Sequence, residues 1–373
     1  MHPEYALIVT FSQASYKQGN PAAPPADAHK EAKTLENEAY QHATSLASGN
    51  PQEEPADVGT EIGKYKNAVH HRNGLCSHVY KARAPQHGLD NLSGSEHSSA
   101  LVALKVTVPS ADAPPHNSER EVRLLEKARS SNVIPLWETF RQAGGRLVMV
   151  FPFMPYGLDQ LLQRQHLPEP QGKACLQDLF TALAHVHSQG IIHRDVKPSN
   201  ILLKSLSGPA YLADFGIAWS GDDPDSEPAD HKITDVGTTC YRPPELLFGN
   251  TKYGASLDLW AAGCVAAEVT GLGNRTLFDA GDLGSELALV QSIFKSLGTP
   301  NLEVWPEAAE FPDWGKMQFY EYPAKPWSEL LPKASQSARD LVSKLVQYES
   351  GRRMSASEAL AHPYLTDRPS MQP

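Results

Sequence analysis

Residues 193–200 read HRDVKPSN, and a DFG triplet that begins with Asp214 follows soon after. Transfer of a phosphoryl group needs oxygen ligands for a metal, a carboxylate close to the attacking hydroxyl, and a cation for the developing charge. We therefore expect Asn200 and Asp214 to bind Mg²⁺. Asp195 is expected to act as the catalytic carboxylate, and Lys197 to neutralise charge on the transferred group.

A second cation is expected further upstream, because the inner phosphates of ATP also need neutralising. The apolar, β-branched run ALVALKVTV predicts a strand that carries Lys105. Its best carboxylate partner is Glu121, 16 residues on, with Glu119 and Glu126 as nearby rivals. Glu121 falls in a predicted helix for which Ser118 is the expected N-cap, with Glu121 completing a capping box.

The elements that must position these residues change in character along the chain. Apolar runs at 79–84, 100–108 and 146–153 predict strands. Later segments, among them 158–165 and 174–190, have apolar residues at helical spacing. Strands early and helices late predict an α+β protein with a small strand-rich lobe and a larger helical lobe.

The motifs VALK, HRD, DFG and PPE occur in this order, so the chain resembles a eukaryotic protein kinase from about Gly59 to Leu365. The segments GTTCYRPPELLFG and QSIFKSLGTPNLEVWP resemble the cyclin-dependent kinase branch. The resemblance implies a two-lobed kinase domain over residues 58–366, divided into an N-lobe at 58–153 and a C-lobe at 154–366. It also implies ATP and Mg²⁺ as cofactors.

Further roles follow from the resemblance alone. Lys197 together with Thr238 resembles serine/threonine kinases. The remaining implied roles are a loop over the phosphates at Gly74, a gatekeeper at Phe151, hinge residues Phe153 and Met154 at the adenine, a catalytic-loop anchor at Asp258, and a pair between Arg353 and Glu245.

Two features depart from the family pattern near the nucleotide. The expected glycine-rich loop keeps only Gly74, which should loosen the lid without abolishing transfer. The segment before the Glu121 helix keeps the family's RE-x-x-LL ending but lacks its PSTAIRE sequence. This second departure puts dependence on a cyclin in doubt.

The activation segment departs as well. Family members grip a phosphothreonine with three arginines. Arg194 fits the first and Arg120 the second, but Trp219 stands at the third. Ile233 aligns with the usual phosphoacceptor, and Thr234 is one residue away.

The same segment carries five acids and no basic residue in DDPDSEPAD at 222–230. We hypothesise that activity does not need phosphorylation of this segment, and that the acids partly replace the phosphate. The plainer interpretation is a solvated acidic loop.

These departures together resemble single-subunit fungal cyclin-dependent-kinase-activating kinases. The resemblance implies that the substrate is the activation-loop threonine of another cyclin-dependent kinase, in cell-cycle control, and that a cyclin is possible but not required. One alternative is a cyclin-dependent transcriptional kinase. Another is a pseudokinase scaffold, against which the four retained residues argue: Lys105, Asp195, Asn200 and Asp214.

Composition and charge limit the partners and the cellular location that we expect. The 373 residues carry a net charge of −10, which argues against a protein that coats nucleic acid. The four cysteines form no CxxC pair, and no apolar run approaches the ~20 residues of a membrane span. We expect a cytoplasmic and/or nuclear protein with no membrane or nucleic-acid partner. Residues 1–57, with six prolines and eight acids, are expected to be a disordered acidic extension, and 367–373 a short tail.

Overall fold

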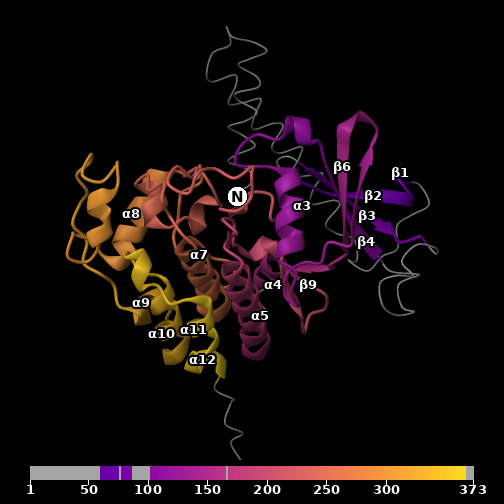
Figure 1. Cartoon of the computed structure of the whole chain (residues 1–373). Helices are drawn as coiled ribbons and strands as arrows, with labels where there is room; N and C mark the ends of the chain where they lie inside the picture. Colours follow the sequence, from indigo (N-terminus) through magenta and orange to yellow (C-terminus); the bar gives the residue numbers. More distant parts are fainter. Residues whose placement is uncertain (1–58, 75–76, 86–100, 165–166, 367–373) are drawn as a thin grey trace, which may run out of the picture.

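The computed structural model describes residues 59–74, 77–85, 101–164 and 167–366. The predicted N-terminal extension and the C-terminal tail lie outside these residues, so the disorder of residues 1–57 stays a prediction. Strands gather at one end of the molecule and helices at the other (Figure 1). The predicted α+β class, with a strand-rich small lobe and a helical large lobe, is confirmed. Among the described helices, none has both the length and the apolar character needed to cross a bilayer.

The described part of the small lobe combines one six-stranded antiparallel sheet, in the order β1-β2-β3-β4-β6-β5, with the helix α3. Its elements are β1 (Thr60–Ile62), β2 (Tyr65–Asn73), β3 (Ser77–Arg83), β4 (Leu101–Thr107), α3 (Ser118–Lys127), β5 (Glu138–Gln142) and β6 (Arg146–Pro152).

The large lobe is built on helices, with short strand pairs around the catalytic residues. The strands are β7 (Tyr156–Gly157), β8 (Ile191–Ile192), β9 (Ile201–Leu203), β10 (Ala210–Leu212) and β11 (Trp219–Ser220). The helices are α4 (Leu158–Gln163), α5 (Glu169–Ser188), α6 (Pro244–Leu247), α7 (Ser256–Ala267), α8 (Glu286–Leu297), α9 (Trp327–Leu330), α10 (Gln336–Leu345), α11 (Ala356–Leu360) and α12 (Pro363–Thr366).

Strand β4 places Lys105 by simple alternation. Val102, Leu104 and Val106 are buried in the core of the small lobe. Because successive side chains of a strand point to opposite faces, Lys105 projects from the other face of the sheet. Its neighbours in the ladder are Val79 on β3 and Met149 on β6, so the strand that carries it is held on both sides.

The N-cap of helix α3 lies one residue earlier than the sequence predicted. The N-cap is Asn117, whose side-chain oxygen accepts a hydrogen bond from the amide of Arg120. Ser118 is the first helical residue, and its amide and hydroxyl both donate to Asp112. The predicted capping box is wrong because asparagine caps this helix equally well and Glu121 is bound elsewhere.

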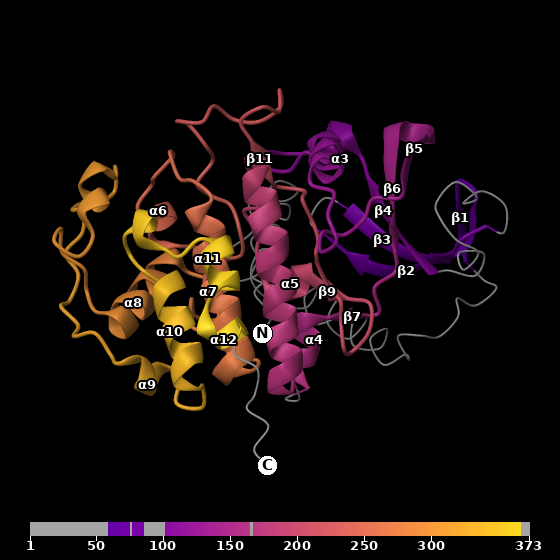
Figure 2. The same cartoon turned by 60° about the horizontal axis from the view of Figure 1, so that its bottom comes forward.

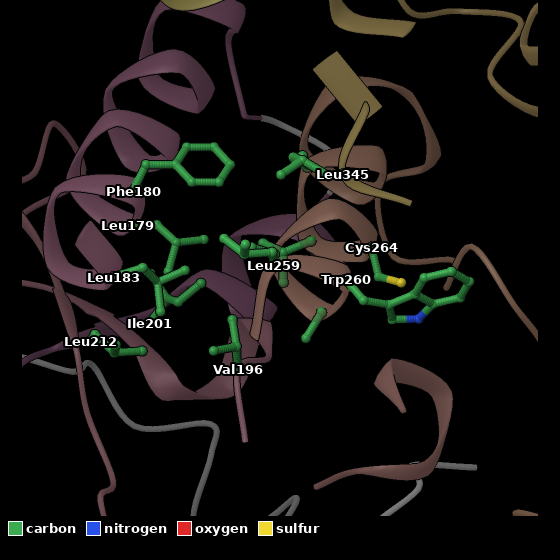
Figure 3. Close-up of a cluster of buried hydrophobic side chains, with 14 of the residues drawn as sticks. Leu179, Phe180, Leu183, Val196, Ile201, Leu212, Leu259, Trp260, Cys264 and Leu345 are labelled. Carbon is green, nitrogen blue, oxygen red and sulfur yellow. The ribbon is translucent and has the colours of Figure 1, made fainter. Parts of the chain in front are cut away.

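The core of the large lobe forms where α5 and α7 face each other. Leu179 and Phe180 of α5 and Leu259 of α7 are all buried, and Figure 3 shows them directed toward one another. Figure 2 shows α5 running through the middle of the molecule. At Gly263 of α7 an added Cβ would lie 2.6 Å from Val346, so glycine permits the close approach of the chain just after α10.

One buried carboxyl is left incompletely satisfied at the end of α7. Glu268 opens a π-helical segment (Glu268–Leu272) and is 4% exposed. Its Oε1 has no hydrogen-bond partner among the described residues. Burial raises the pKa of Glu268 to about 8, although a hydrogen bond with Tyr241 acts to lower it.

Glu268→Gln is expected to flatten the pH dependence of stability between about pH 5 and pH 8. The unfolded carboxyl ionises near its ordinary pKa of 4.5, while the folded one keeps its proton up to about pH 8. The wild-type free energy of unfolding therefore falls as pH rises through this window, by on the order of 3 kcal/mol. The neutral glutamine lacks this dependence. Urea unfolding at several pH values measures it, with exposed Glu310→Gln as the control, and parallel curves for wild type and Glu268→Gln would contradict it.

Candidate active site

Lys105 joins the two lobes through two carboxylates. Its Nζ donates to both oxygens of Glu121, at 2.7 and 2.8 Å, and to Oδ1 of Asp214 at 2.8 Å. Of the two rival carboxylates on α3, Glu119 instead pairs with Arg141 and Glu126 is exposed. Desolvation acts to lower the pKa of Lys105, but the two carboxylates hold it above its ordinary value. Lys105 therefore stays cationic.

Asn200 and Asp214 are brought together by a two-stranded hairpin. Asn200 directly precedes β9, and Asp214 lies two residues after β10, which pairs with β9 antiparallel. A backbone hydrogen bond from Ala213 to the carbonyl of Asn200 (2.9 Å) closes the hairpin at this end. Residues 14 positions apart in the sequence thus reach one site.

The side chains of Asn200 and Asp214 suit a magnesium–nucleotide ligand. The Asn200 amide nitrogen donates to Asp195, and its carbonyl oxygen has no hydrogen bond among the described residues. Asp214 is half-exposed, and Lys105 holds the pKa of its carboxyl well below the usual range although desolvation alone would raise it. An ionised carboxylate and an amide oxygen are the kinds of ligand that Mg²⁺ prefers.

Asp195 lies at the centre of a polar network. Its Oδ2 accepts from Asn200 (2.9 Å) and lies 3.1 Å from Nζ of Lys197. Its Oδ1 accepts from the amide and the hydroxyl of Thr238, at 3.1 and 3.0 Å, and Lys197 in turn donates to that hydroxyl. The structure therefore brings all three predicted catalytic residues, and Thr238 from the activation segment, into one cluster.

The side chain of Asp258 anchors the catalytic loop through backbone hydrogen bonds. This buried carboxylate accepts hydrogen bonds from the backbone amides of His193 and Arg194, at 2.8 and 2.9 Å, and contacts His187 at 2.9 Å. Burial would raise the pKa of Asp258, but the His187 contact and these bonds hold it below its ordinary value. Arg194 has a φ of 69°, a strained conformation that the hydrogen bonds from the two backbone amides to Asp258 stabilise.

The predicted adenine-side residues line the connection between the lobes. Phe151 is buried on β6, and the amide of Phe153 donates to the carbonyl of Leu101 at 3.0 Å. Met154, the next residue, packs against the large core. No role beside the hinge was predicted for His71, whose ring lies 5.1 Å from that of Phe153 and whose pKa burial lowers to about 4.

The lid over this region is only partly described. The amide of Gly74 donates to the carbonyl of Ser77 at 2.8 Å, and an added Cβ at Gly74 would meet the Ser77 hydroxyl at 2.7 Å. Arg72, at the first expected glycine position, lies 4.0 Å from Asp159 of α4. This ion pair links the lid strand to the large lobe.

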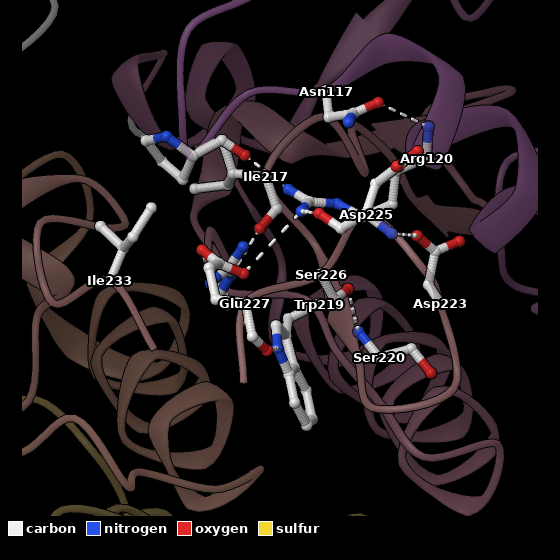
Figure 4. Close-up of polar contacts among 12 residues, drawn as sticks. Asn117, Arg120, Ile217, Trp219, Ser220, Asp223, Asp225, Ser226, Glu227 and Ile233 are labelled. Atoms are coloured by element: carbon white, nitrogen blue, oxygen red, sulfur yellow. Dashed lines mark hydrogen bonds and ion pairs between the residues drawn. The ribbon is translucent and has the colours of Figure 1, made fainter. Parts of the chain in front are cut away.

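The activation segment places an acid where both predicted phosphate-binding arginines meet. Arg194 Nη1 lies 3.1 Å from Glu227 Oε1, and Arg120 Nη1 lies 3.8 Å from Glu227 Oε2 (Figure 4). Trp219, at the third arginine position, donates its indole N–H to the backbone carbonyl of Glu227. Within the described residues, Thr234 makes no side-chain hydrogen bond to either arginine.

Arg353 and Glu245 form a buried bidentate ion pair. The two N–O distances are 2.5 and 2.7 Å, and both side chains are almost inaccessible. The Arg353 guanidinium also lies 5.0 Å from the centroid of the Trp260 ring. The pair ties the segment after η8 (Ser350–Arg352) to α6, next to the activation segment.

Arg353→Met is expected to lower the free energy of unfolding by about 3–5 kcal/mol, because it leaves the Glu245 carboxylate buried without its counter-ion. Lys344→Met is the matched control: it removes a half-exposed lysine that pairs with Asp340 on the surface, and should cost less than about 1 kcal/mol. Denaturant unfolding of both variants measures the difference. Equal losses in the two variants would contradict a structural role for the buried pair.

Comparisons with known proteins agree with this geometry. Residues 92–365 match the protein kinase domain model. The serine/threonine-protein kinase csk1 of Schizosaccharomyces pombe is 39% identical over 259 residues, 68% of this chain and 83% of the relative. Cyclin-dependent kinase 20 of Danio rerio is 36% identical over 69% of this chain and 73% of its own length. The human protein of the same name is 34% identical over 76% of this chain and 80% of its own length.

Proposed function

This chain belongs to the protein kinase family and is a serine/threonine kinase similar to the cyclin-dependent kinases, and on that premise we propose that it phosphorylates the activation-loop threonine of another cyclin-dependent kinase as a single chain. The observation that carries the proposal is the position of α3. There, Lys105 contacts Glu121 of α3 and Asp214 of the large lobe at once. A protein kinase transfers phosphate when this Lys–Glu pair and the metal-binding Asp are both in place.

The proposed mechanism assigns each task to a residue of this chain. Asp195 accepts the proton of the substrate hydroxyl and orients it for attack. Lys197 lies beside Asp195 and neutralises charge on the group in transfer, while Lys105 binds the inner phosphates. Asp214 and Asn200 would hold Mg²⁺, which supplies charge neutralisation on the phosphates when bound.

Thr238 closes the substrate side of this site. It contacts both Asp195 and Lys197 through its hydroxyl, so it fixes the rotamers of the two side chains that act on the incoming hydroxyl. Preorganisation of this kind reduces the rearrangement required when the substrate binds. The substrate hydroxyl would take the place of the Thr238 hydrogen bond on Asp195.

The choice of substrate rests on the departures from the family pattern. The lid keeps one of three glycines, the segment before α3 lacks the PSTAIRE sequence, and acids occupy the activation segment. Single-subunit kinases that activate cyclin-dependent kinases combine such features. The similarity to relatives named cyclin-dependent kinase 20 is consistent with this branch.

The proposal is tested with the purified full chain, Mg-ATP and a catalytically inactive cyclin-dependent kinase as substrate. We expect one phosphate per substrate molecule, on the activation-loop threonine, mapped by mass spectrometry. A substrate with valine in place of that threonine is the matched control and should remain unmodified. Phosphate placed elsewhere would refute the substrate assignment, and transfer that requires an added cyclin would favour the cyclin-dependent transcriptional kinase.

A further inference from the structure

Two buried arginines lie side by side behind the catalytic loop. Arg120 of α3 is 3% exposed and Arg194 is 1% exposed. Burial lowers the pKa of Arg120, and the charge of Arg194 lowers it further. Two like charges in such a position need an anion, because an unpaired buried charge is strongly destabilising. The acid that contacts both guanidinium groups is Glu227.

The contacts between Glu227 and the two arginines leave some buried polar atoms without a partner. Glu227 Oε2, Arg120 Nε and Arg194 Nη2 are buried and have no hydrogen-bond partner among the described residues. A carboxylate has two oxygens to offer, whereas a phosphate has three. Glu227 therefore supplies one negative charge against two positive charges, and it leaves two of the arginine nitrogens without a partner among the described residues.

Each arginine is next in sequence to a residue of the active site. Arg194 precedes Asp195, and Arg120 precedes Glu121, the carboxylate that binds Lys105. An anion that holds the two arginines together therefore fixes the catalytic loop and α3 relative to each other. Arg194 Nη1 also donates a hydrogen bond to the Tyr253 hydroxyl at 3.1 Å. Arg194 is therefore held by Glu227 of the activation segment and by Tyr253 of the large lobe.

The residues before Glu227 bind the exposed part of the same helix. Arg123 makes a bidentate pair with Asp223 and also contacts Asp225 at 2.6 Å, and Lys127 lies 3.1 Å from Asp222. These basic residues follow Arg120 along one side of α3. Four of the five acids thus contact basic residues of α3, whereas Asp222 and Asp230 stay largely exposed to solvent.

We propose that Glu227 is a positioning residue that holds Arg120 and Arg194 together in the unmodified chain, in place of a phosphorylated side chain. The proposal rests on the kinase activity argued above and names how that activity is maintained. It sharpens the hypothesis that the acids of residues 222–230 partly replace a phosphate: one of the five acids reaches both arginines. The other acids that contact α3 act on its exposed side.

The test uses the full-length chain, shown by intact mass to carry no phosphate, with Mg-ATP and myelin basic protein as a general substrate. The variants are Glu227→Gln, which removes the charge, and Glu227→Asp, which keeps it at a shorter reach. Asp230→Asn is the matched control, since it removes one charge from the same segment at an exposed position that contacts neither arginine. Amide hydrogen exchange of residues 118–127 is measured on each protein.

We expect Glu227→Gln to lower kcat by about 30-fold or more, with faster exchange in α3 and a lower thermal midpoint, because the two buried arginines lose their anion. Glu227→Asp should fall between wild type and Glu227→Gln, and Asp230→Asn should match the wild type in kcat and in exchange. A structural role alone would shift the midpoint without this order of kcat values. If Glu227→Gln does not fold, Glu227→Asp decides, because full wild-type activity in that variant overturns the proposal.

Other outcomes separate this inference from the proposed function. A Glu227→Gln chain as active as the wild type overturns the inference and leaves the kinase activity intact. A wild-type chain that is inactive until another kinase phosphorylates it also overturns the inference alone. A wild-type chain that binds ATP but transfers no phosphate under any condition refutes the proposed function, and the inference with it.

Discussion

Replacing Asp195 with asparagine is expected to lower kcat by about 10³-fold, with little change in the KM for ATP. The carboxylate accepts hydrogen bonds from Asn200 and Thr238 and forms an ion pair with Lys197. These contacts orient it toward the substrate hydroxyl. Asparagine has a similar shape but cannot take the proton, and its amide hydrogens would face the Lys197 ammonium group. The loss should therefore appear in the transfer step rather than in nucleotide binding.

Steady-state kinetics with Mg-ATP and a protein substrate measures this effect. Asp313→Asn is the control, because it changes the same functional group at a half-exposed surface position that pairs with Lys316. The control should retain wild-type kinetics. If Asp195→Asn keeps a kcat near that of the wild type, Asp195 is not the catalytic carboxylate.

Lys105→Arg is expected to reduce kcat/KM by about 10²–10³-fold, although it keeps the positive charge. The Lys105 ammonium group makes three short contacts, to two oxygens of Glu121 and one of Asp214, in a site where its side chain is 14% exposed. The longer, planar guanidinium of arginine cannot reproduce this geometry. It would displace α3 or block the position of the inner phosphates.

The same kinetic assay tests this prediction, together with ATP binding by fluorescence or calorimetry. Exposed Lys316→Arg is the matched control and should leave kcat/KM unchanged. A Lys105→Arg variant with nearly wild-type kcat/KM would show that positive charge alone is sufficient. The paired geometry at Glu121 and Asp214 would then carry less of the activity than we infer.

That the site residues lie close together could be predicted from the sequence, because phosphoryl transfer limits which residue types can serve and how they are spaced. Asp195, Asn200 and Asp214 fall on a loop and on a hairpin whose strands are short and apolar, and the structure assembles them as those strands imply. Glu121 was preferred to its two neighbours by its distance from Lys105 along the chain, and the structure shows that contact.

Other features depend on the path of the chain through space and could not be predicted. Glu227 lies 33 residues from Arg194 and 107 from Arg120, and nothing local distinguishes it from the other acids of its segment. The same holds for buried Lys232, whose Nζ lies 4.7 Å from the centroid of the Trp219 ring. The start of α3 was placed one residue late because Asn117 and Ser118 are both good N-caps.

Short strands were also missed. Strand β1 has three residues and strand β5 reads ETFRQ, so neither carries an apolar run long enough to be recognised. Both are held in place by pairing with longer neighbours, β2 and β6. Pairing of this kind comes from the tertiary structure, which the local sequence does not contain.

The measurement that tests the account most directly is phosphate transfer by the purified single chain, made without any cyclin and free of phosphate. It is incubated with labelled Mg-ATP and a protein substrate, next to its Asp195→Asn variant, and the products are analysed for phosphoamino acids. The account predicts phosphoserine or phosphothreonine with the wild type and almost none with the variant. No transfer by the wild type, in a chain that binds ATP, would contradict the account and leave a pseudokinase.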